Sequence, residues 1–590
     1  MCESVTIDEQ VGVAEILALC DDAVDHVLDY LGDSREDSLG GVGLLEAFCA
    51  TAKTLVIELF YFDLDIRSEL ALQQETAFTL VSQDPSRLHF FSDEATPGVR
   101  ARDFVEQAKD SYLGYSIIRP ERVGRFGRSI VTPRVTLGGR VPVEIGERQI
   151  RTAVTEVVQL FGVQLLAVGV PFMEQDGALL RCAHVSAWIC HYTAVLRGAV
   201  PRRTTGFFHS RSIGQGSVGR PYPSDGLSTP SLSTMLSEAD LPPQVVDEYL
   251  LRQDRALTWA DRPELIKQVS KPKKYSKEWK RAWTRENLAD TICRYLNSAI
   301  PVILTRDSIN HTQVVVGYLR EEDLDKTLGD SRQSDTHSDM VAFIVADDTR
   351  GPYEIVYLDD LVAEILNESI AATSIVIPLP RALWMTGDAA EKVATERFAV
   401  YAQTRLEAID KWPAVAGDHQ LAKSLRVALT PFAKALAKPG SNQFTVRTYA
   451  SPGTDFKYSF AKRVADEELV RQVGYTWLPK YVWVIEILDR HLRRQGREAV
   501  VATMVLDSTK VVFEDANETY RDVWPLFIHL PGQALAVPPY FGYYAETDQN
   551  EASWFVAPSE PYFSGRWSHK VLTDYPLQRI AGLAKTALGS

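Results

Sequence analysis

Hydrophobic and polar positions alternate along this chain with two different periods, which predict a mixture of helices and strands. Apolar residues in Val11–Leu31 recur at helical spacing between acidic residues, which predicts one amphipathic helix. Thr54–Asp65, Ser111–Pro120 and Gln159–Phe172 instead have the apolar character and alternation of strands. The elements before residue 150 predict an α+β domain at 1–150, and Gln159–Phe172 leads into the segment that follows it.

A further helix is predicted in Glu174–Arg197, and a cysteine opens it. Cys182 starts an apolar run whose members recur at helical spacing, so it lies near the first turn of a largely buried helix. Unpaired backbone N–H groups and the helix dipole favour a thiolate there, and the thiolate is the nucleophilic form of cysteine. Gln175, a few residues upstream, can direct a side-chain N–H at a developing oxyanion.

A base and an orienting carboxylate follow on later strands. Pro301–Tyr318 is predicted to form a strand, a polar turn and a second strand, and His311 stands at the start of the second strand. The apolar run Val341–Ala346 ends in Asp347 and Asp348. A carboxylate at a strand end can orient an imidazole, which completes a set of nucleophile, base and orienter.

Each of these residues also has an ordinary structural interpretation. A cysteine among apolar residues is usually a small core residue, and Cys190, two turns further along the same helix, is interpreted in that way. His184 and His191 do not share the helix face of Cys182, so we expect structural or solvent-facing roles for them. Asp347 is preferred to Asp348 as the orienter, although either carboxylate is compatible with an ordinary strand-end turn.

The motifs that carry this set resemble those of a known family. They are Gln175, Cys182 with Tyr192 on its helix, HTQVVVGY from His311 and DDTRG from Asp347. In this order they are similar to the papain-like cysteine proteases, and most of all to the stand-alone bacterial relatives of the bacteriocin-leader (double-glycine) peptidases. The resemblance covers roughly residues 161–378.

The resemblance implies a fold and an activity. It implies a papain-like cysteine peptidase domain at 151–380, in which the helix that carries Cys182 packs on an antiparallel sheet that carries His311 and Asp347. It also implies hydrolysis of peptide bonds by a Cys-His-Asp triad, with Gln175 in the oxyanion hole. The expected partner is a peptide or protein substrate, and thiolate chemistry of this kind requires no cofactor.

The sequence after this region predicts another mixed domain. Ala389–Trp412 and His419–Ala437 have helical spacing, whereas the apolar runs Tyr481–Leu488 and Ala499–Leu506 are interpreted as strands or buried helix edges. The whole chain is therefore expected to be α+β, with domains at 1–150, 151–380 and 381–590. Within the central domain, Arg202–Leu241 is rich in Gly, Ser and Pro and is predicted to form a long loop beside the cleft.

Charge disfavours nucleic acid as the main partner. The chain has 63 basic and 78 acidic residues, a formal net charge of −15. Lys271–Arg285 mixes basic and aromatic residues, but we interpret it as a surface turn whose tryptophans pack inward.

The arginines between Arg119 and Arg128 are interpreted as a solvated turn, the alternative being a site for phosphate or an acidic peptide.

Cysteine usage and hydropathy suggest a cytoplasmic protein. The six cysteines form no CxxC pair, so neither a disulfide framework nor a zinc site of that type is expected, and no other metal-ligand motif occurs. The N-terminus has no secretory signal pattern, and no stretch of about 18 apolar residues predicts a membrane span. The oligomeric state stays open.

Two alternatives to a peptidase remain at this stage. The same residues support transglutaminase or N-acyltransferase chemistry, in which an amine replaces water at the acyl-enzyme. From a different class, a papain-like domain without activity would bind peptides or partner proteins, and Cys182 would then lie beyond hydrogen-bonding reach of His311.

Overall fold

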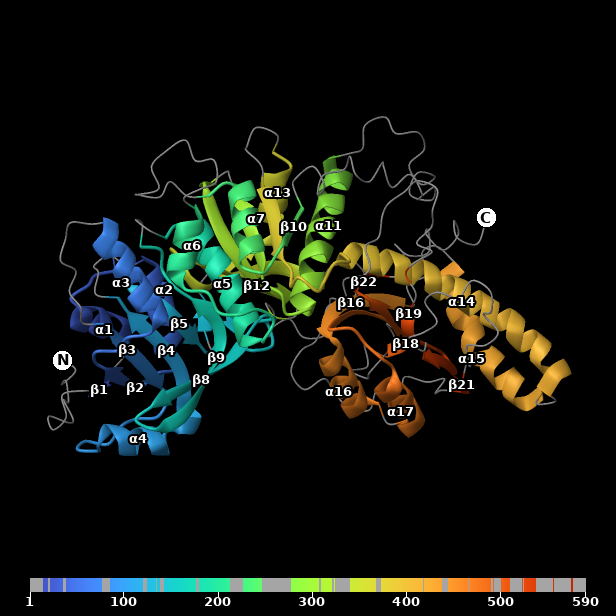
Figure 1. The fold of residues 1–590 in the computed structure, drawn as a ribbon, viewed down its shortest axis with the longest axis horizontal. Helices are drawn as coiled ribbons and strands as arrows, with labels where there is room; N and C mark the ends of the chain where they lie inside the picture. Colours follow the sequence, from blue (N-terminus) through green and yellow to red (C-terminus); the bar gives the residue numbers. More distant parts are fainter. Residues whose placement is uncertain are drawn as a thin grey trace. The chain divides into compact units, whose positions relative to one another are not determined.

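The structure is a computed structural model of the 590-residue chain. It describes residues 14–19, 22–35, 39–76, 85–119, 125–133, 135–137, 143–176, 180–212, 227–246, 277–306, 309–320, 323, 340–367, 373–416, 419–437, 444–464, 466–489, 492, 500–509, 523, 525–536, 555–556 and 575–576. Both helices and sheets are present, which confirms the predicted α+β class (Figure 1).

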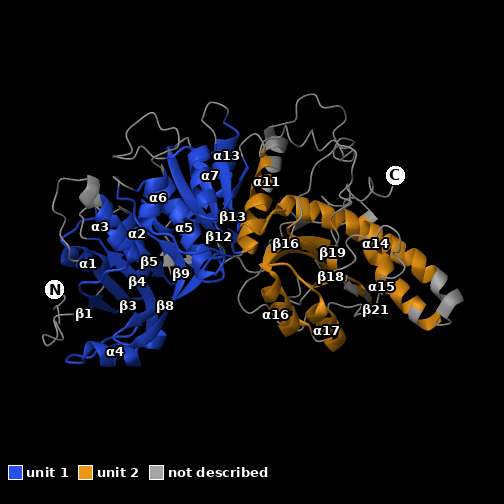
Figure 2. Ribbon diagram, viewed as in Figure 1, with its two compact units in different colours: residues 1–248, 299–380 blue, residues 249–298, 381–590 orange. Residues whose placement is uncertain are grey.

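The chain divides into two compact units, each built from two separate stretches of sequence (Figure 2). Unit 1 comprises residues 1–248 and 299–380, and unit 2 comprises residues 249–298 and 381–590. All the residues of the predicted set belong to unit 1. The finer division into three domains stays a prediction.

The N-terminal part of unit 1 is a seven-stranded antiparallel sheet with helices around it. Its strand order is β1-β2-β3-β4-β5-β9-β8. The strands are β1 Ala14–Ala18, β2 Thr54–Glu58, β3 Ser86–Phe91, β4 Tyr112–Ile118, β5 Phe126–Val131, β8 Val154–Leu160 and β9 Val163–Phe172. The associated helices are α1 Ala23–Leu31, α2 Leu39–Cys49, α3 Leu64–Thr76, α4 Ala101–Gln107 and the 3-10 turn η1 Lys109–Ser111; β6 Val135–Leu137 and β7 Val143–Ile145 form a separate hairpin.

The single helix predicted at Val11–Leu31 is wrong. Of its described residues, Ala14–Ala18 form strand β1 and Ala23–Leu31 are helical. β1 pairs antiparallel with β2, and this register places Ile16 opposite Val56. Both of these side chains are buried. The short apolar stretch is therefore a strand because it pairs with β2. The spacing of its apolar residues does not show this pairing.

The second sheet of unit 1 has six antiparallel strands in the order β10-β15-β11-β12-β13-β14. The strands are β10 Pro243–Val246, β11 Val302–Arg306, β12 His311–Arg320, β13 Met340–Asp347, β14 Gly351–Tyr357 and β15 Thr373–Pro378. Helix α5, Cys182–Leu196, contacts β12 and β11 of this sheet and also β8 and β9 of the first one. α13, Leu358–Ile365, packs on β13 and β14. A buried helix therefore links the two sheets and carries the cysteine.

The long loop predicted at Arg202–Leu241 is wrong where the structure describes it. It contains two helices, α6 Thr205–Ser212 and α7 Thr229–Glu238. The polar residues before α7 are helix-start signals, because the Ser228 hydroxyl accepts a hydrogen bond from the Ser231 backbone N–H and a proline follows in the first turn. Both α6 and α7 contact α5, so this segment supports the cysteine helix.

Unit 2 contains a third antiparallel sheet, in the order β21-β20-β19-β18-β17-β16-β22. The strands are β16 Phe444–Pro452, β17 Tyr481–Asp489, β18 Val500–Asp507, β19 Pro525–Leu530, β20 Gln533–Ala536, β21 Phe555–Val556 and β22 Tyr575–Pro576. The helices are α11 Lys277–Asn297, α14 Gly387–Ala416, α15 His419–Ala437, α16 Gly453–Arg463 and α17 Glu467–Tyr475. The two predicted helices of the C-terminal region are thus confirmed, and its two apolar runs are strands, not helix edges.

Part of one predicted feature lies outside the described residues. Of Lys271–Arg285, residues 271–276 are not described, nor are the side chains of Trp279 and Trp283. Residues 277–285 lie in helix α11, so the interpretation as a turn is wrong there. Within the described part of the chain, no helix combines the length and the apolar character needed to cross a membrane.

Candidate active site

Cys182 is the first residue of α5, and the local sequence explains why the helix begins there. Arg181 is extended, and its carbonyl accepts hydrogen bonds from the backbone N–H groups of His184 and Val185 at 2.9 and 3.1 Å. The His184 ring reaches back, so that its Nδ1 accepts the backbone N–H of Arg181 at 3.3 Å. This contact is the N3 half of a capping box, with histidine in place of the usual Glu or Gln. The half-buried thiol of Cys182 is thus held in the first helical turn.

His311 is the first residue of β12, and it meets Cys182 across the interface between α5 and the sheet. The thiol lies close enough to the imidazole to be one of the groups that raise the pKa of His311. One turn beyond Cys182, the Ser186 hydroxyl donates to the carbonyl of Thr312 at 3.3 Å. The helix is therefore tied to the strand directly beside the residue that carries the imidazole.

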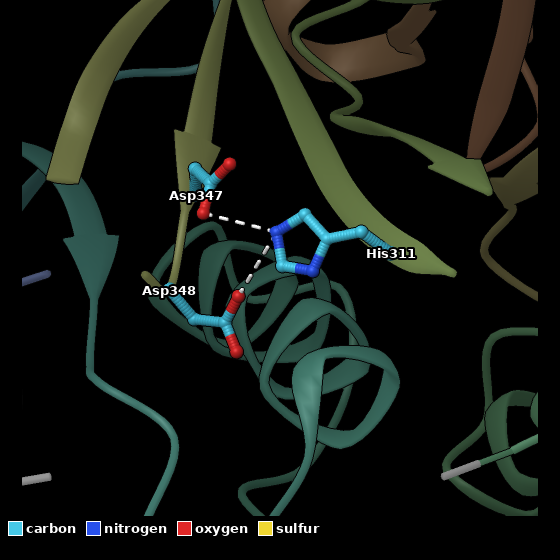
Figure 3. Close-up of side chains that lie close together, drawn as sticks. All are labelled: His311, Asp347 and Asp348. Carbon is cyan, nitrogen blue, oxygen red and sulfur yellow. Dashed lines mark hydrogen bonds and ion pairs between the residues drawn. The ribbon is translucent and has the colours of Figure 1, made fainter. Parts of the chain in front are cut away.

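Asp347, the last residue of β13, holds the other side of the imidazole (Figure 3). Its Oδ1 lies 3.0 Å from His311 Nε2, a distance typical of a charge-assisted hydrogen bond. The carboxylate is itself fixed, because Gln313 Nε2 donates to Oδ2 at 2.5 Å and the Thr349 backbone N–H and hydroxyl donate to Oδ1 at 2.9 and 2.8 Å. With Nε2 occupied by Asp347, Nδ1 is the ring nitrogen left to face the thiol.

Electrostatics in this cluster favour a charged imidazole. Burial alone would lower the pKa of His311, but the hydrogen bonds with Asp347 and Cys182 outweigh it and raise that pKa to about 10. Burial alone would raise the pKa of Asp347. The contact with His311 and the hydrogen bonds donated by Gln313 and Thr349 outweigh burial and hold the pKa of this carboxyl well below its usual range. The geometry thus stabilises an imidazolium next to a thiol.

Asp348 lies on the same side of the imidazole as Asp347. Its Oδ1 is 3.5 Å from His311 Nε2, which is ion-pair distance but longer than the contact made by Asp347. The residue is only 3% exposed, and among the described residues neither carboxylate oxygen accepts a hydrogen bond from another residue. Burial raises the pKa of Asp348 to about 7. His311, Asp347 and Asp348 also offer three potential metal-ligand atoms within 4.8 Å of one another.

Gln175 lies half-buried in the segment between β9 and α5. The residue before it is firmly anchored: the Glu174 carboxylate accepts the backbone N–H groups of Gly41 at 2.6 Å and Phe126 at 3.2 Å, and Arg119 donates to the Glu174 carbonyl at 3.0 Å. Within the described residues, no hydrogen bond joins the Gln175 side chain to Cys182 or His311. Its role at the oxyanion therefore stays a prediction.

The glycines of α2 allow that helix to pack against the loop after Asp347, a feature that the sequence interpretation missed. A Cβ atom on Gly43 would lie 1.7 Å from the carbonyl oxygen of Arg350, and one on Gly40 would lie 2.4 Å from that of Asp348. Gly351 closes the loop with φ +132°, a backbone conformation that favours glycine. The signal in the sequence is the unusual run LGGVG inside a helix.

The remaining polar residues of α5 have structural roles. His184 and His191 are fully buried, and burial lowers their pKa values to about 3 and about 4. His191 Nε2 accepts the backbone N–H of Arg203 at 3.0 Å. Cys190 is buried in the core, which raises its pKa well above the ordinary value. The structural interpretation of these residues agrees with their positions, and the solvent-facing alternative for the two histidines is wrong.

Two arginines of the predicted solvated turn, Arg119 and Arg128, are internal. Arg119 is 2% exposed and pairs with Glu69, with Nε 2.8 Å from Oε2. Arg128 is 5% exposed and donates from Nη1 to Glu156 at 2.7 Å and to the Tyr192 hydroxyl at 2.8 Å. The solvated-turn interpretation is therefore wrong for both. Arg128 instead fixes the C-terminal half of α5 against the first sheet.

Comparison of the chain with protein-family models, with curated proteins and with solved structures gave no match. The function proposed below is therefore argued from the residues and geometry of this chain.

Proposed function

We propose that this protein is a papain-like cysteine peptidase, with Cys182 as nucleophile, His311 as general base and acid, and Asp347 as the orienter of the imidazole. The observation that carries the proposal is the His311 imidazole, which Asp347 holds at 3.0 Å and whose pKa the nearby Cys182 thiol helps to raise. A domain that only bound peptides would not need this arrangement, so the contact supports catalysis over a binding scaffold.

The reaction follows from the positions of the three groups. The Cys182 proton moves to His311, and the thiolate sulfur forms a bond with the carbonyl carbon of the scissile peptide. The tetrahedral intermediate collapses as the carbon–nitrogen bond breaks, and the imidazolium gives its proton to the leaving amine. Water, deprotonated by His311, then attacks the thioester and releases the acid product with the free thiol.

Two groups are proposed to stabilise the oxyanion. The backbone N–H of Cys182 stands at the start of α5, where it has no partner within the helix. Gln175 precedes it in a segment whose backbone is anchored through Glu174. This anchoring supports a fixed position for the amide, which oxyanion stabilisation requires.

The proposal is tested with a thiol-directed activity probe on the full chain. Wild-type protein should be labelled at Cys182, and Cys182→Ala should lose that labelling. Cys190→Ala is the matched control, because it removes a buried thiol from the same helix, and it should be labelled like the wild type. Equal labelling of Cys182→Ala and wild type would contradict the assignment.

A second measurement identifies the acceptor of the acyl group. Cellular proteins are incubated with wild type or Cys182→Ala, with and without an added primary amine, and the new termini are identified by mass spectrometry. New carboxyl and amino termini that depend on Cys182 indicate hydrolysis. Amine adducts without cleaved free acids would contradict hydrolysis and indicate acyl transfer.

A further inference from the structure

We propose that His311, Asp347 and Asp348 form a binding site for one Zn²⁺ ion, and that the bound ion blocks catalysis. The inhibition part rests on the proposed peptidase function, whereas the metal site itself does not. The three side chains are the ones drawn in Figure 3, where both carboxylates are directed at the same nitrogen of the imidazole.

The spacing of the three donor atoms suits a small tetrahedral ion. Zinc binds imidazole nitrogen and carboxylate oxygen at about 2.0–2.2 Å, so the ligand atoms of a tetrahedral site lie roughly 3.4 Å apart. His311 Nε2 is 3.0 Å from Asp347 Oδ1 and 3.5 Å from Asp348 Oδ1. Small adjustments therefore convert this cluster into three ligands of one ion, with the fourth position open to water.

Asp348 is the residue that distinguishes this cluster from an ordinary triad. A triad needs one orienting carboxylate, and Asp347 fulfils that role through its hydrogen bond to His311. The second carboxylate is 3% exposed, and no described neighbour donates a hydrogen bond to either oxygen. Burying such a group without a hydrogen bond is costly, and a bound cation would remove that cost.

The backbone around the site is fixed by close packing. Gly40 of α2 packs directly on the carbonyl of Asp348, where a Cβ would lie only 2.4 Å from the oxygen. Thr349 and Gln313 hold the Asp347 carboxylate. Two of the proposed ligands thus start from preorganised positions, which is the condition for a specific site.

The donor set selects zinc over the common hard cations. One imidazole and two carboxylates are typical zinc ligands, whereas Ca²⁺ takes six to eight oxygens and Mg²⁺ requires a nearly octahedral oxygen shell. Zinc would bond to the Nε2 lone pair of His311, and the proton on that nitrogen would leave to solvent. Asp347 would change from hydrogen-bond acceptor to metal ligand, so the imidazole would lose the orienter that catalysis needs.

Zinc binding is measured by calorimetric titration of the full-length Cys182→Ala protein, which lacks the reactive thiol. We expect one Zn²⁺ per chain at this site, and at least about tenfold weaker binding for Cys182→Ala combined with Asp348→Asn. The control is His419→Gln in the same background, because His419 is an exposed histidine at the start of α15 and should not change the site. Equal affinity with and without Asp348→Asn would overturn the proposal.

Cobalt provides a test that needs no substitution in the buried site. With Co²⁺ added to wild-type protein in place of zinc, nitrogen and oxygen ligands should give a visible ligand-field band without a thiolate-to-cobalt charge-transfer band. A strong charge-transfer band would identify Cys182 as the metal ligand and would overturn the three-residue site.

Inhibition is measured separately, as the rate of probe labelling of wild type and of Asp348→Asn at increasing Zn²⁺ concentration. The rate of each protein is divided by its own rate without zinc. Wild type should be inhibited and restored by a chelator, and Asp348→Asn should need at least about tenfold more zinc. The same zinc sensitivity in both proteins would contradict the inference. Absence of labelling in zinc-free wild type would contradict the peptidase proposal alone, because the titrations with Cys182→Ala do not depend on activity.

Discussion

The hydroxyl of Ser186 donates a hydrogen bond to the carbonyl of Thr312 across 3.3 Å, and so ties the cysteine helix to the strand that begins with His311. Ser186→Ala removes this tie while leaving the thiol and the imidazole intact. We expect kcat/KM to fall by about tenfold, because small displacements of reacting groups are costly, with little change in Tm. Ser233→Ala, which removes a hydroxyl bonded within α7, is the control and should keep full activity. Unchanged turnover in Ser186→Ala would contradict a positioning role.

The raised pKa of His311 predicts an alkaline limit for activity. Because that pKa is about 10, the imidazolium is kept below this pH and is lost as the pH rises through it. Asp347→Asn keeps an acceptor oxygen beside Nε2 but removes the negative charge, so the alkaline limb of kcat/KM should move to lower pH. Asp360→Asn, at an exposed position of α13, should leave the profile in place. If kcat/KM falls at the same alkaline pH in Asp347→Asn and in wild type, Asp347 does not act on the imidazole.

The His184 cap predicts that a side chain outside the proposed triad sets the position of the nucleophile. His184→Ala removes the acceptor of the Arg181 N–H and should lower both Tm and the rate of probe labelling, with a loss of about 1 kcal/mol typical of a missing cap. Glutamine is a normal capping-box residue, so His184→Gln should recover most of the labelling rate. Equal defects in both variants would indicate a packing role instead.

The close approach of α2 to the loop after Asp347 predicts an unusual sensitivity to one methyl group. In Gly43→Ala the new Cβ would lie 1.7 Å from the Arg350 carbonyl, which forces the backbone to shift. We expect a stability loss of about 1–3 kcal/mol and slower labelling of Cys182. Gly474→Ala is the matched control, because no atom lies within 4 Å of its added Cβ. If Gly43→Ala keeps wild-type Tm and labelling, the contact does not position the loop.

A buried histidine of the first sheet predicts loss of stability in mild acid. Burial lowers the pKa of His89 to about 4 from an ordinary 6.5, and its ring contacts Tyr112 Oη at 2.9 Å and Arg87 Nε at 3.0 Å. The unfolded chain therefore binds a proton as the pH falls below about 6.5 while the folded protein does not. The contribution of His89 to the free energy of unfolding should be fully present above that pH. It should fall towards pH 4, by up to about 1.4 kcal/mol per pH unit.

Calorimetric Tm values between pH 7.5 and 4.5 test this prediction. His89→Gln should show a shallower decline than wild type, since one titrating group is gone. His419→Gln, at an exposed position, should follow the wild-type curve. An ordinary His89 pKa in an NMR titration of the folded protein would contradict the prediction.

The elements that carry the candidate site could be predicted because their signals are local. Helical spacing after Cys182 indicated α5, and the strand before and after the turn at His311 followed from short apolar runs and polar turn residues. The last residue of β13 was equally accessible, because the apolar run ends at Asp347. These segments have one dominant period and clear boundaries.

Features that depend on distant partners could not be predicted in this way. Strand β1 forms because β2 is available to pair with it, and α2 approaches the Asp347 loop because both backbones carry glycine. Gln313 had a usable signal, since alternate residues of a strand share a face and this residue stands two places after His311. The burial of Asp348 without a donor appears only once three segments of the chain are brought together.

The path of the chain through unit 1 has a consequence for biosynthesis. The polypeptide leaves unit 1 after residue 248 and returns to it at residue 299, between the nucleophile and its base. A ribosome that adds roughly 5–20 residues per second therefore exposes the thiol several seconds before the imidazole emerges. A nascent chain released early would carry Cys182 without His311 and Asp347, so the proposed activity would begin only after translation has passed the aspartate.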